Sequence, residues 1–195
     1  MNLGLETGTA APALIAALRP VAETARLWLP RDLPKATAAF APGDETADVF
    51  LLLSGLVKLV YTTENGDAWI KSFILDQGVF SGLGADRGAS DAAPGESYGA
   101  DCLEPCRMVR LPRRFVQEAV AGDAGVRAAY DAFAAWVLAR KQAREAALLT
   151  LTPEARYRAL RTHAPAALAR LPQGDVARFI GVTPVAFSRI KRRVT

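Results

Sequence analysis

The stretch that decides the fold is LPQGDVARFIGVTPVAFSRIKRR, which runs from Leu171 to Arg193. Its first part predicts a short helix, and Gly181 follows at a corner that needs positive φ. Thr183 and Pro184 are typical of the start of a second helix, as N-cap and first helical residue. The residues on the inner face of the first helix are Val176, Ala177 and Ile180. The stretch therefore predicts two short helices joined by a tight turn.

The second helix of this pair has two chemically different faces. Phe187, Ile190 and Val194 recur at the spacing of a buried face. The opposite face carries Val185, Ser188, Arg189 and Arg192. Ala177 supplies the small residue that two steeply crossing helices need at their contact. This is the helix-turn-helix pattern, in which the second helix enters the major groove of DNA.

The pattern assigns provisional roles to its exposed side chains. Arg189 is the best candidate for reading guanine, and Val185 for contacting a thymine methyl group. The cations near the end of the second helix are suited to contact DNA phosphates, and such contacts raise affinity without selecting a base sequence. The predicted DNA-binding residues are Gln173, Thr183, Val185, Ser188, Arg189, Lys191, Arg192 and Arg193.

The charge of the chain is unevenly distributed. From Pro153 onward, nine Arg and Lys residues face two acids, a net charge of +7, whereas the whole chain carries +4. The remainder therefore has a net charge of −3. An acidic body joined to a basic end indicates a module that meets a polyanion, although a charged face can also serve only for solvation.

The sequence pattern in the centre of the chain predicts an antiparallel sheet. The run FLLLSGLVKLVYTTENGDAWIKSFIL, residues 50–75, contains two strand-like segments. Asn65-Gly66 between them is typical of a two-residue hairpin turn. The sheet region is expected to end at CRMVRLP, residues 106–112. Before the sheet, residues 10–30 predict one or two short helices with Pro20 and Pro30 as stops.

After the sheet the hydrophobic period becomes helical. A seam at steps of four and three predicts one helix of roughly 25 residues, about 37 Å long. Its residues are Val126, Tyr130, Phe133, Val137, Arg140, Arg144 and Ala147, with Trp136 beside them. We favour pairing with a second copy of the chain through Val126, Tyr130, Phe133, Trp136 and Val137. The alternative is that this helix packs back on its own sheet.

Few residues suit metal or redox chemistry. Cys102 and Cys106 would lie roughly 13 Å apart on one strand, too far for a disulfide, and we interpret them as ordinary core residues. His163 is the single histidine, and alone it makes no usual metal site. We therefore expect no metal, no cofactor and no enzymatic activity. No signal peptide or membrane span is predicted, which favours a cytoplasmic location.

These motifs together resemble the CRP/FNR transcription regulators from about Ala36 to Arg193. FAPGD, FLLLSGLVKL, NGD, LDQGVFSG and RLPRRF follow the order of the β-roll of that family, and residues 171–193 are similar to its DNA-binding end. The resemblance implies an α+β fold: an antiparallel, cyclic-nucleotide-binding-like β-roll of the jelly-roll type, a long dimerisation helix and a C-terminal helix-turn-helix. The expected domains are residues 1–120, the β-roll sensor with N-terminal helices; 121–150, the dimerisation helix; and 151–195, the DNA-binding domain. The printed sequence ends at Thr195, so the β-wing of such winged-helix-like domains is short or absent, or the sequence is truncated.

The resemblance also directs attention to an effector pocket. In family members that bind cyclic AMP, a glycine-glutamate pair holds the ribose and an arginine-serine pair holds the phosphate. Here Leu83 follows Gly82, and Glu96 precedes Ser97, so a carboxylate would face the phosphate. Arg87 is a cation in the same segment. These five residues are the pocket candidates, with an effector other than cyclic AMP, or none.

The function implied is a sequence-specific, DNA-binding transcription regulator that acts as a homodimer on double-stranded DNA. Its partners would be DNA, a second copy and an unidentified small molecule, with no membrane. The alternative is a small-molecule sensor or protein-interaction module whose DNA-binding domain is degenerate.

Overall fold

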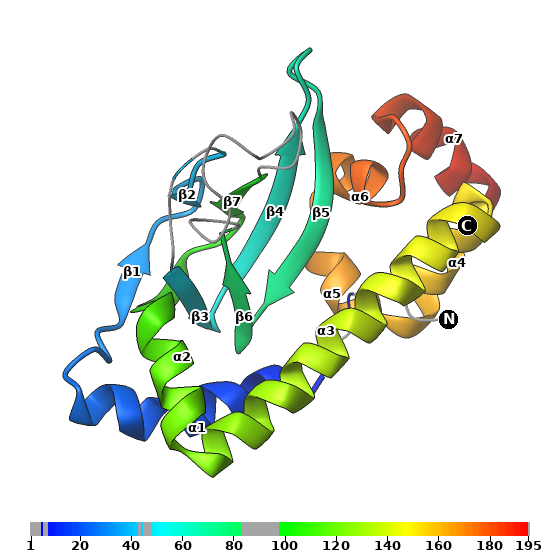
Figure 1. The fold of residues 1–195 in the computed structure, drawn as a ribbon. Helices are drawn as coiled ribbons and strands as arrows, with labels where there is room; N and C mark the ends of the chain where they lie inside the picture. The colour runs from blue at the N-terminus through cyan, green and yellow to red at the C-terminus, as the bar shows by residue number, and fades with distance from the viewer. Residues whose placement is uncertain (1–4, 6–7, 43, 45–47, 83–97, 195) are drawn as a thin grey trace.

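The chain folds into two facing antiparallel sheets with helices outside them (Figure 1). A computed structural model describes residue 5 and residues 8–42, 44, 48–82 and 98–194. The strands are β1 (Arg31–Leu33), β2 (Ala38–Phe40), β3 (Asp48–Ser54), β4 (Leu56–Thr62), β5 (Ala68–Leu75), β6 (Gly78–Ser81), β7 (Tyr98–Cys102) and β8 (Cys106–Pro112). The helices are α1 (Ala10–Thr24), α2 (Arg113–Gly122), α3 (Ala124–Thr150), α4 (Pro153–His163), α5 (Pro165–Arg170), α6 (Gln173–Phe179) and α7 (Pro184–Val194). The expected α+β class is confirmed.

The strands alternate between the sheets in the manner of a jelly roll. One sheet has the order β1-β8-β3-β6 and the other β2-β7-β4-β5. Phe50 and Leu52 of β3 face the second sheet, whereas Leu51 between them faces α1. Since β3 is buried on both faces, its sequence is a continuous apolar run. The rings of Phe50 and Phe80 stack with centroids 5.0 Å apart in the space between the sheets.

The β4–β5 hairpin forms as predicted, but its turn is longer than two residues. Thr63 N–H donates to Asp67 C=O at 2.9 Å, which leaves a three-residue loop ending in Gly66. Gly66 has φ +81°, whereas Asn65 does not have positive φ. Three-residue hairpin loops need only one left-handed position, and glycine occupies it here.

The N-terminal half of α3 packs against its own chain. Val126 is 1% exposed and lies in a cluster with Leu14 and Leu18 of α1, and Phe133 and Trp136 pack against the same cluster. Val126 is therefore already covered by its own chain, whereas Tyr130 in the same half of the helix is 41% exposed. No helix of the described ranges, α3 included, combines the length and apolar content of a membrane span.

Pro20 does not stop α1, contrary to expectation. The helix continues to Thr24 because proline removes only its own N–H, and the bonds around it persist. Thr24 Oγ1 donates to Pro20 C=O at 2.9 Å, and Ala25 N–H donates to Val21 C=O at 3.0 Å.

The predicted separation of Cys102 and Cys106 was wrong. Cys102 ends β7 and Cys106 begins β8, so a turn brings the two thiols together. Burial raises the pKa of the Cys102 thiol to about 12, and the adjacent Cys106 acts in the same direction. Both cysteines are free and buried. A raised pKa disfavours the reactive thiolate, so the core interpretation stands.

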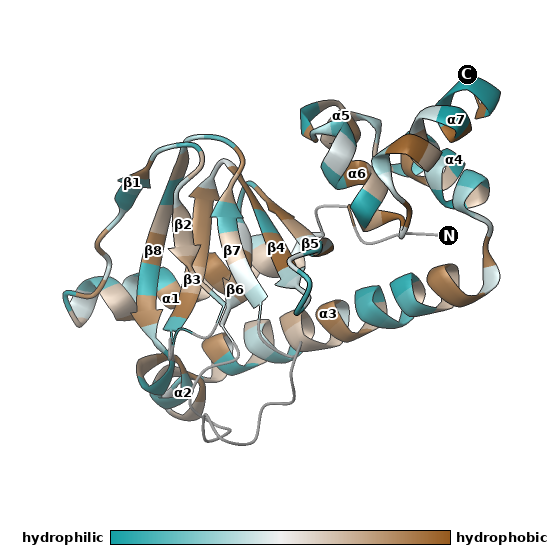
Figure 2. Ribbon diagram, turned by 90° about the horizontal axis from the view of Figure 1, so that it is seen from above, coloured by the Kyte–Doolittle hydropathy of each residue, from teal (hydrophilic) through white to brown (hydrophobic). Residues whose placement is uncertain are grey.

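The basic C-terminal helices dock on the second sheet, at the opposite end of α3 from α1 and α2 (Figures 1 and 2). One apolar cluster joins Leu56 and Phe73 of the sheet to Leu160 of α4 and to Val176 and Phe179 of α6. The rings of Phe73 and Phe179 lie 5.2 Å apart. We call residues 153–194 the C-terminal module.

Arg170 fastens the edge of this docking surface. It donates to Glu104 at 3.0 and 2.6 Å, to Asp76 at 2.6 Å and to Gly55 C=O at 3.2 Å. These three acceptors lie in or beside the turns after β7, β5 and β3. The hydrogen bonds that Arg170 donates to the carboxylates of Glu104 and Asp76 raise its pKa, so the guanidinium stays charged. One arginine of α5 therefore ties three turns of the β-roll to the C-terminal module.

Replacement of Arg170 tests this connection. Arg170→Met should lower the free energy of unfolding by about 1–2 kcal/mol, because it removes charged hydrogen bonds from a partly buried position. Urea unfolding measures this value. Arg158→Met is the matched control, since Arg158 is exposed on α4 and has no interaction within the described residues. Equal losses in both variants would contradict the assignment.

The same cluster predicts a pH effect. Burial raises the pKa of Asp76, but hydrogen bonds from Arg170 and Gly55 outweigh it and leave that pKa lowered. The stabilisation is therefore present above the unfolded pKa of about 4 and is lost as pH falls through the lower folded value. Asp76→Asn should flatten the acid limb of a stability-versus-pH curve. An unchanged slope would show that Asp76 is not held by Arg170 in solution.

Candidate functional site

The helix-turn-helix forms where the sequence predicts it. α6 ends at Phe179, Gly181 has φ +79°, and α7 begins at Pro184. Thr183 caps α7, since its Oγ1 accepts from Ala186 N–H at 3.3 Å. Five of the predicted inner residues are buried, and Val194 is only partly buried; the buried ones are Val176, Ala177, Ile180, Phe187 and Ile190. Tyr157 of α4 closes this small core with an edge contact to Phe187 at 4.9 Å.

The outer face of α7 is open to solvent. Val185 is 67% exposed, and Ser188, Arg189 and Arg192 are also exposed. Arg189 has no hydrogen bond or ion pair within the part of the chain that the structure describes. Within the same residues, Arg192 donates to Ser188 C=O of its own helix at 3.5 Å. This face carries two cations and no acid, so it is free to meet an anionic surface.

The remaining predicted DNA contacts flank that face. Lys191 Nζ donates to Gln173 Oε1 at 2.9 Å, and this hydrogen bond connects α7 to the start of α6. Arg193 lies 3.6 Å from Glu154 of α4. These residues and the α7 face form one surface, which we call the α7 surface: Gln173, Thr183, Val185, Ser188, Arg189, Lys191, Arg192 and Arg193. Its side chains come from both helices of the motif.

Sequence reasoning missed a buried acid beneath this surface. Asp175 of α6 is 5% exposed and lies 3.5 Å from Lys58 of β4 and 3.6 Å from Arg178. Lys58 thus links the sheet to the first helix of the motif. An acid in the first turn of a helix was visible in the sequence, but its partner, 117 residues away, was not.

The predicted effector pocket is described only at one residue. Gly82 is buried, and its C=O accepts from Arg113 at 2.9 Å. Leu83, Arg87, Glu96 and Ser97 lie outside the described residues.

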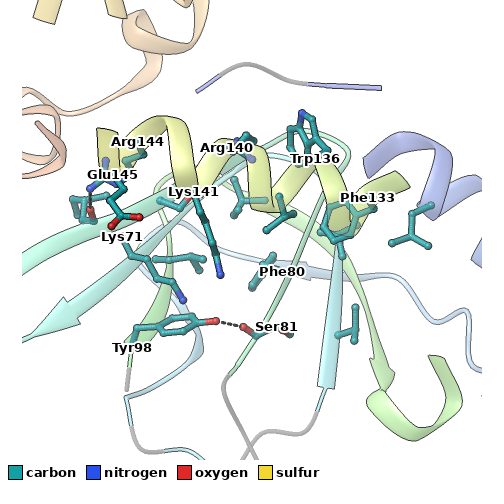
Figure 3. Close-up of a pocket in the computed structure, with 18 of the residues that line it drawn as sticks. Lys71, Phe80, Ser81, Tyr98, Phe133, Trp136, Arg140, Lys141, Arg144 and Glu145 are labelled. Carbon is teal, nitrogen blue, oxygen red and sulfur yellow. Dashed lines mark hydrogen bonds between the residues drawn. The ribbon is translucent and has the colours of Figure 1, made fainter. Parts of the chain in front are cut away.

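A large cavity lies between the β-roll and α3 (Figure 3). Its volume is about 1280 Å³. Phe80 and Trp136 are among its apolar walls, and Lys71, Lys141 and Arg144 are among its cations. Tyr98 lies across the cavity from α3 and donates to Ser81 C=O at 2.5 Å. A cavity of this size, mostly apolar with a few polar groups, is typical of a small-molecule site.

Arg144 connects the cavity to the helix-turn-helix. Its guanidinium donates to Ile70 C=O of β5 at 2.8 Å and to Phe179 C=O of α6 at 3.1 Å. It also lies 4.1 Å from the Phe179 ring. Burial, together with the charge of Arg156, lowers the pKa of Arg144 to about 10. The group stays charged at neutral pH and needs these carbonyl partners.

The turn of the motif can be tested with two glycines. Gly181→Ala should lower the free energy of unfolding by about 1–2 kcal/mol, because alanine is strained at positive φ. The added Cβ would lie 3.6 Å from Leu148, an ordinary contact, so the backbone causes the loss. Gly174→Ala in α6 is the control: nothing lies near its Cβ, and alanine favours a helix by up to about 1 kcal/mol. Thermal unfolding that moves both variants in one direction would contradict this geometry.

Comparisons with known proteins identify the fold. No protein-family model matches the sequence, and no curated protein does. Among solved structures, FixK2 from Bradyrhizobium japonicum is 17% identical, with a TM-score of 0.68 over 86% of this chain and 84% of that one. CLP from Xanthomonas campestris is 13% identical, with a TM-score of 0.66 over 91% of each chain. A crp/fnr-family regulator from Eubacterium rectale is 11% identical, with a TM-score of 0.67 over 96% and 83%. The chain therefore has the fold of the CRP/FNR transcription regulators, as its motifs predict.

Proposed function

We propose that this chain is a sequence-specific, DNA-binding transcription regulator that acts as a homodimer. The observation that carries the proposal is the α7 surface, whose side chains are largely exposed and include four cations. The inner residues of α6 and α7 form a packed core beneath it. In a helix-turn-helix, the second helix reads the major groove and its flanking cations contact phosphate. The CRP/FNR fold supports the same function.

The α7 surface offers distinct contacts for bases and for phosphates. Arg189 is unpaired within the described residues and can form two hydrogen bonds to guanine. Val185, at the N-terminal end of α7, suits a thymine methyl group. Lys191 already contacts Gln173, so this pair suits a backbone phosphate more than a base edge. Binding should accordingly weaken as salt concentration rises.

The cavity beside α3 suits an effector, because Arg144 borders it and also holds α6. A ligand that moves α3 relative to β5 would act directly on the helix-turn-helix. Allosteric regulation needs such a differential contact between two states. We propose this cavity as the effector site, with a ligand other than cyclic AMP.

The alternative function is a protein-interaction module that has lost DNA binding. Val185 supports it, since an exposed valine on an outer helix face also suits an apolar partner. Arg189 and Arg192 on the same face favour DNA.

The decisive experiment is selection from a pool of random DNA duplexes with the purified chain, followed by sequencing and a salt titration. Enrichment of a two-fold symmetric sequence, with half-sites about 34 Å apart, would support the proposal. Binding of no duplex, with and without cell extract as a source of effector, would favour the interaction module.

Arg189 has a specific prediction. Arg189→Ala should weaken binding to the selected sequence by about 1–3 kcal/mol and relax preference at one base pair. Fluorescence anisotropy on matched and single-mismatch duplexes measures both effects. Arg31→Ala on β1 is the matched control, because Arg31 is exposed and far from α7. A uniform loss on every duplex would assign Arg189 to phosphate.

The dimer would use the part of α3 that its own chain leaves exposed. Tyr130 is 41% exposed, Leu138 57% and Leu149 78%. At 100° per residue these side chains lie on one stripe, next to the buried face that holds Val126. Large exposed apolar residues on a long helix suit a second copy of that helix.

Leu138→Glu tests this interface. The glutamate should raise the dimer dissociation constant by about tenfold or more, because a charge would be buried between the two helices. Sedimentation equilibrium measures the change. Ala139→Glu is the control, since Ala139 is exposed and lies about 100° around α3 from Leu138. A dimer that survives Leu138→Glu would place the interface elsewhere.

A further inference from the structure

Lys71 enters the cavity because of an irregularity in the sheet. Leu59 pairs with Ser72 and Val60 pairs with Ile70, so Lys71 is the extra residue of a β-bulge. Bulges redirect side chains and recur beside functional sites. The Lys71 ammonium lies 3.1 Å from the centroid of the Tyr98 ring and 5.6 Å from that of Tyr61.

A second lysine approaches from the opposite wall. Lys141 of α3 extends toward Tyr98 and the end of Lys71 (Figure 3). Neither ammonium has a hydrogen bond or ion pair within the described residues. Burial, together with the charge of Lys141, lowers the pKa of Lys71 to about 7. Two cations thus converge on one point, and none of the described acids lies between them.

The rest of the lining continues this imbalance. Among the described residues that line the cavity, seven are cationic and only Glu145 is acidic. Arg113, Arg140 and Arg144 have other interactions, which leaves the two lysines as the available pair near Tyr98. Phe80, Phe133 and Trp136 form an apolar wall next to them (Figure 3). A ligand complementary to this lining has one anionic end and one apolar end.

We infer that the cavity binds an amphipathic anion, with its carboxylate or phosphate between Lys71 and Lys141 and its apolar body against Phe80, Phe133 and Trp136. The inference deepens the proposed function, on which the regulatory meaning of such a ligand rests. The anion would supply a countercharge that the described residues do not provide for the two lysines.

Ligand affinity should depend on pH around neutrality. The groups facing Lys71 are Tyr61 of β4, Tyr98 of β7, and Lys141 and Glu145 of α3. Burial raises the pKa of Tyr98 to about 12, and Tyr61 acts in the same direction, so Tyr98 does not titrate near pH 7. The anion favours protonated Lys71, and binding weakens as pH rises through about 7.

Two fluorescent probes of nearly equal shape test the inference on the full chain. 8-Anilinonaphthalene-1-sulfonate carries one anionic group, and N-phenyl-1-naphthylamine is the same ring system without it. We expect Lys71→Met and Lys141→Met each to weaken the sulfonate probe by about tenfold and to leave the neutral probe unchanged. In wild type, the sulfonate affinity should fall from about pH 6 to about pH 8.5, and Lys71→Met should remove this dependence.

Controls separate the cavity from general effects. Lys35→Met removes an exposed lysine from the β1–β2 connection and should change neither probe. Unchanged binding of the neutral probe shows that the cavity variants remain folded. Octanoate should displace the bound sulfonate, whereas octanamide should not.

Equal effects of octanoate and octanamide, or sulfonate binding that is insensitive to both lysines, would overturn the inference. The outcome is independent of DNA binding: a chain that selects no DNA but binds the sulfonate through Lys71 retains the anion site and loses only the proposed regulatory role.

Discussion

A partly buried guanidinium, that of Arg144, fixes the relative positions of three parts of the chain. The residue belongs to α3, and its two carbonyl acceptors belong to β5 and α6. A charge removed from water is stable only if its hydrogen-bond donors are satisfied. Because both acceptors are backbone atoms, the position of α3 determines where the sheet and the first helix of the motif can lie.

Arg156 extends this constraint to the end of α3. It is 7% exposed and donates to Leu148 C=O at 2.9 Å and to Leu151 C=O at 3.1 Å. The last carbonyls of a helix have no partner in the helix itself, so the arginine of α4 satisfies them. Arg144 thus fixes α3 before the α3–α4 turn, and Arg156 fixes α4 after it. The position of this turn determines where the C-terminal module begins.

The cavity and this junction share a strand segment. Lys71 is the bulged residue of β5, and the preceding residue, Ile70, supplies the carbonyl that accepts from Arg144. A displacement of the bulge would therefore move the adjacent peptide unit, whose carbonyl accepts the hydrogen bond from Arg144 that helps to position α6. No separate chain of contacts is needed to connect the cavity with the helix-turn-helix, since one strand residue and one arginine already span the distance.

The sequence predicts the local parts of this arrangement better than the contacts between them. The helix-turn-helix was predictable because each of its determinants, from Ala177 to the cap at Thr183, acts within a few residues. The length of α3 followed from periodicity, but its partner did not: Val126 belongs to a face that suits α1 as well as a second copy. Lys71 was missed because a bulge depends on the register of two strands. The closeness of Cys102 and Cys106 was missed because the turn between them left no clear signal in the sequence.

Docking of the C-terminal module combines two kinds of interaction with different directional requirements. Its centre is apolar, around Phe73 and Phe179, and apolar contact tolerates small sliding because it depends on buried area more than on angle. Its edges are polar and directional, at Arg170 and at the Lys58–Asp175 pair. Arg170 is partly exposed, so breaking its bonds exposes the carboxylates to water at modest free energy. Arg144 is the more enclosed of the two, since burial lowers its pKa, and breaking its bonds requires another acceptor for the charge. The module is therefore held against tilting mainly by the arginine that borders the cavity, and less by the one at the rim.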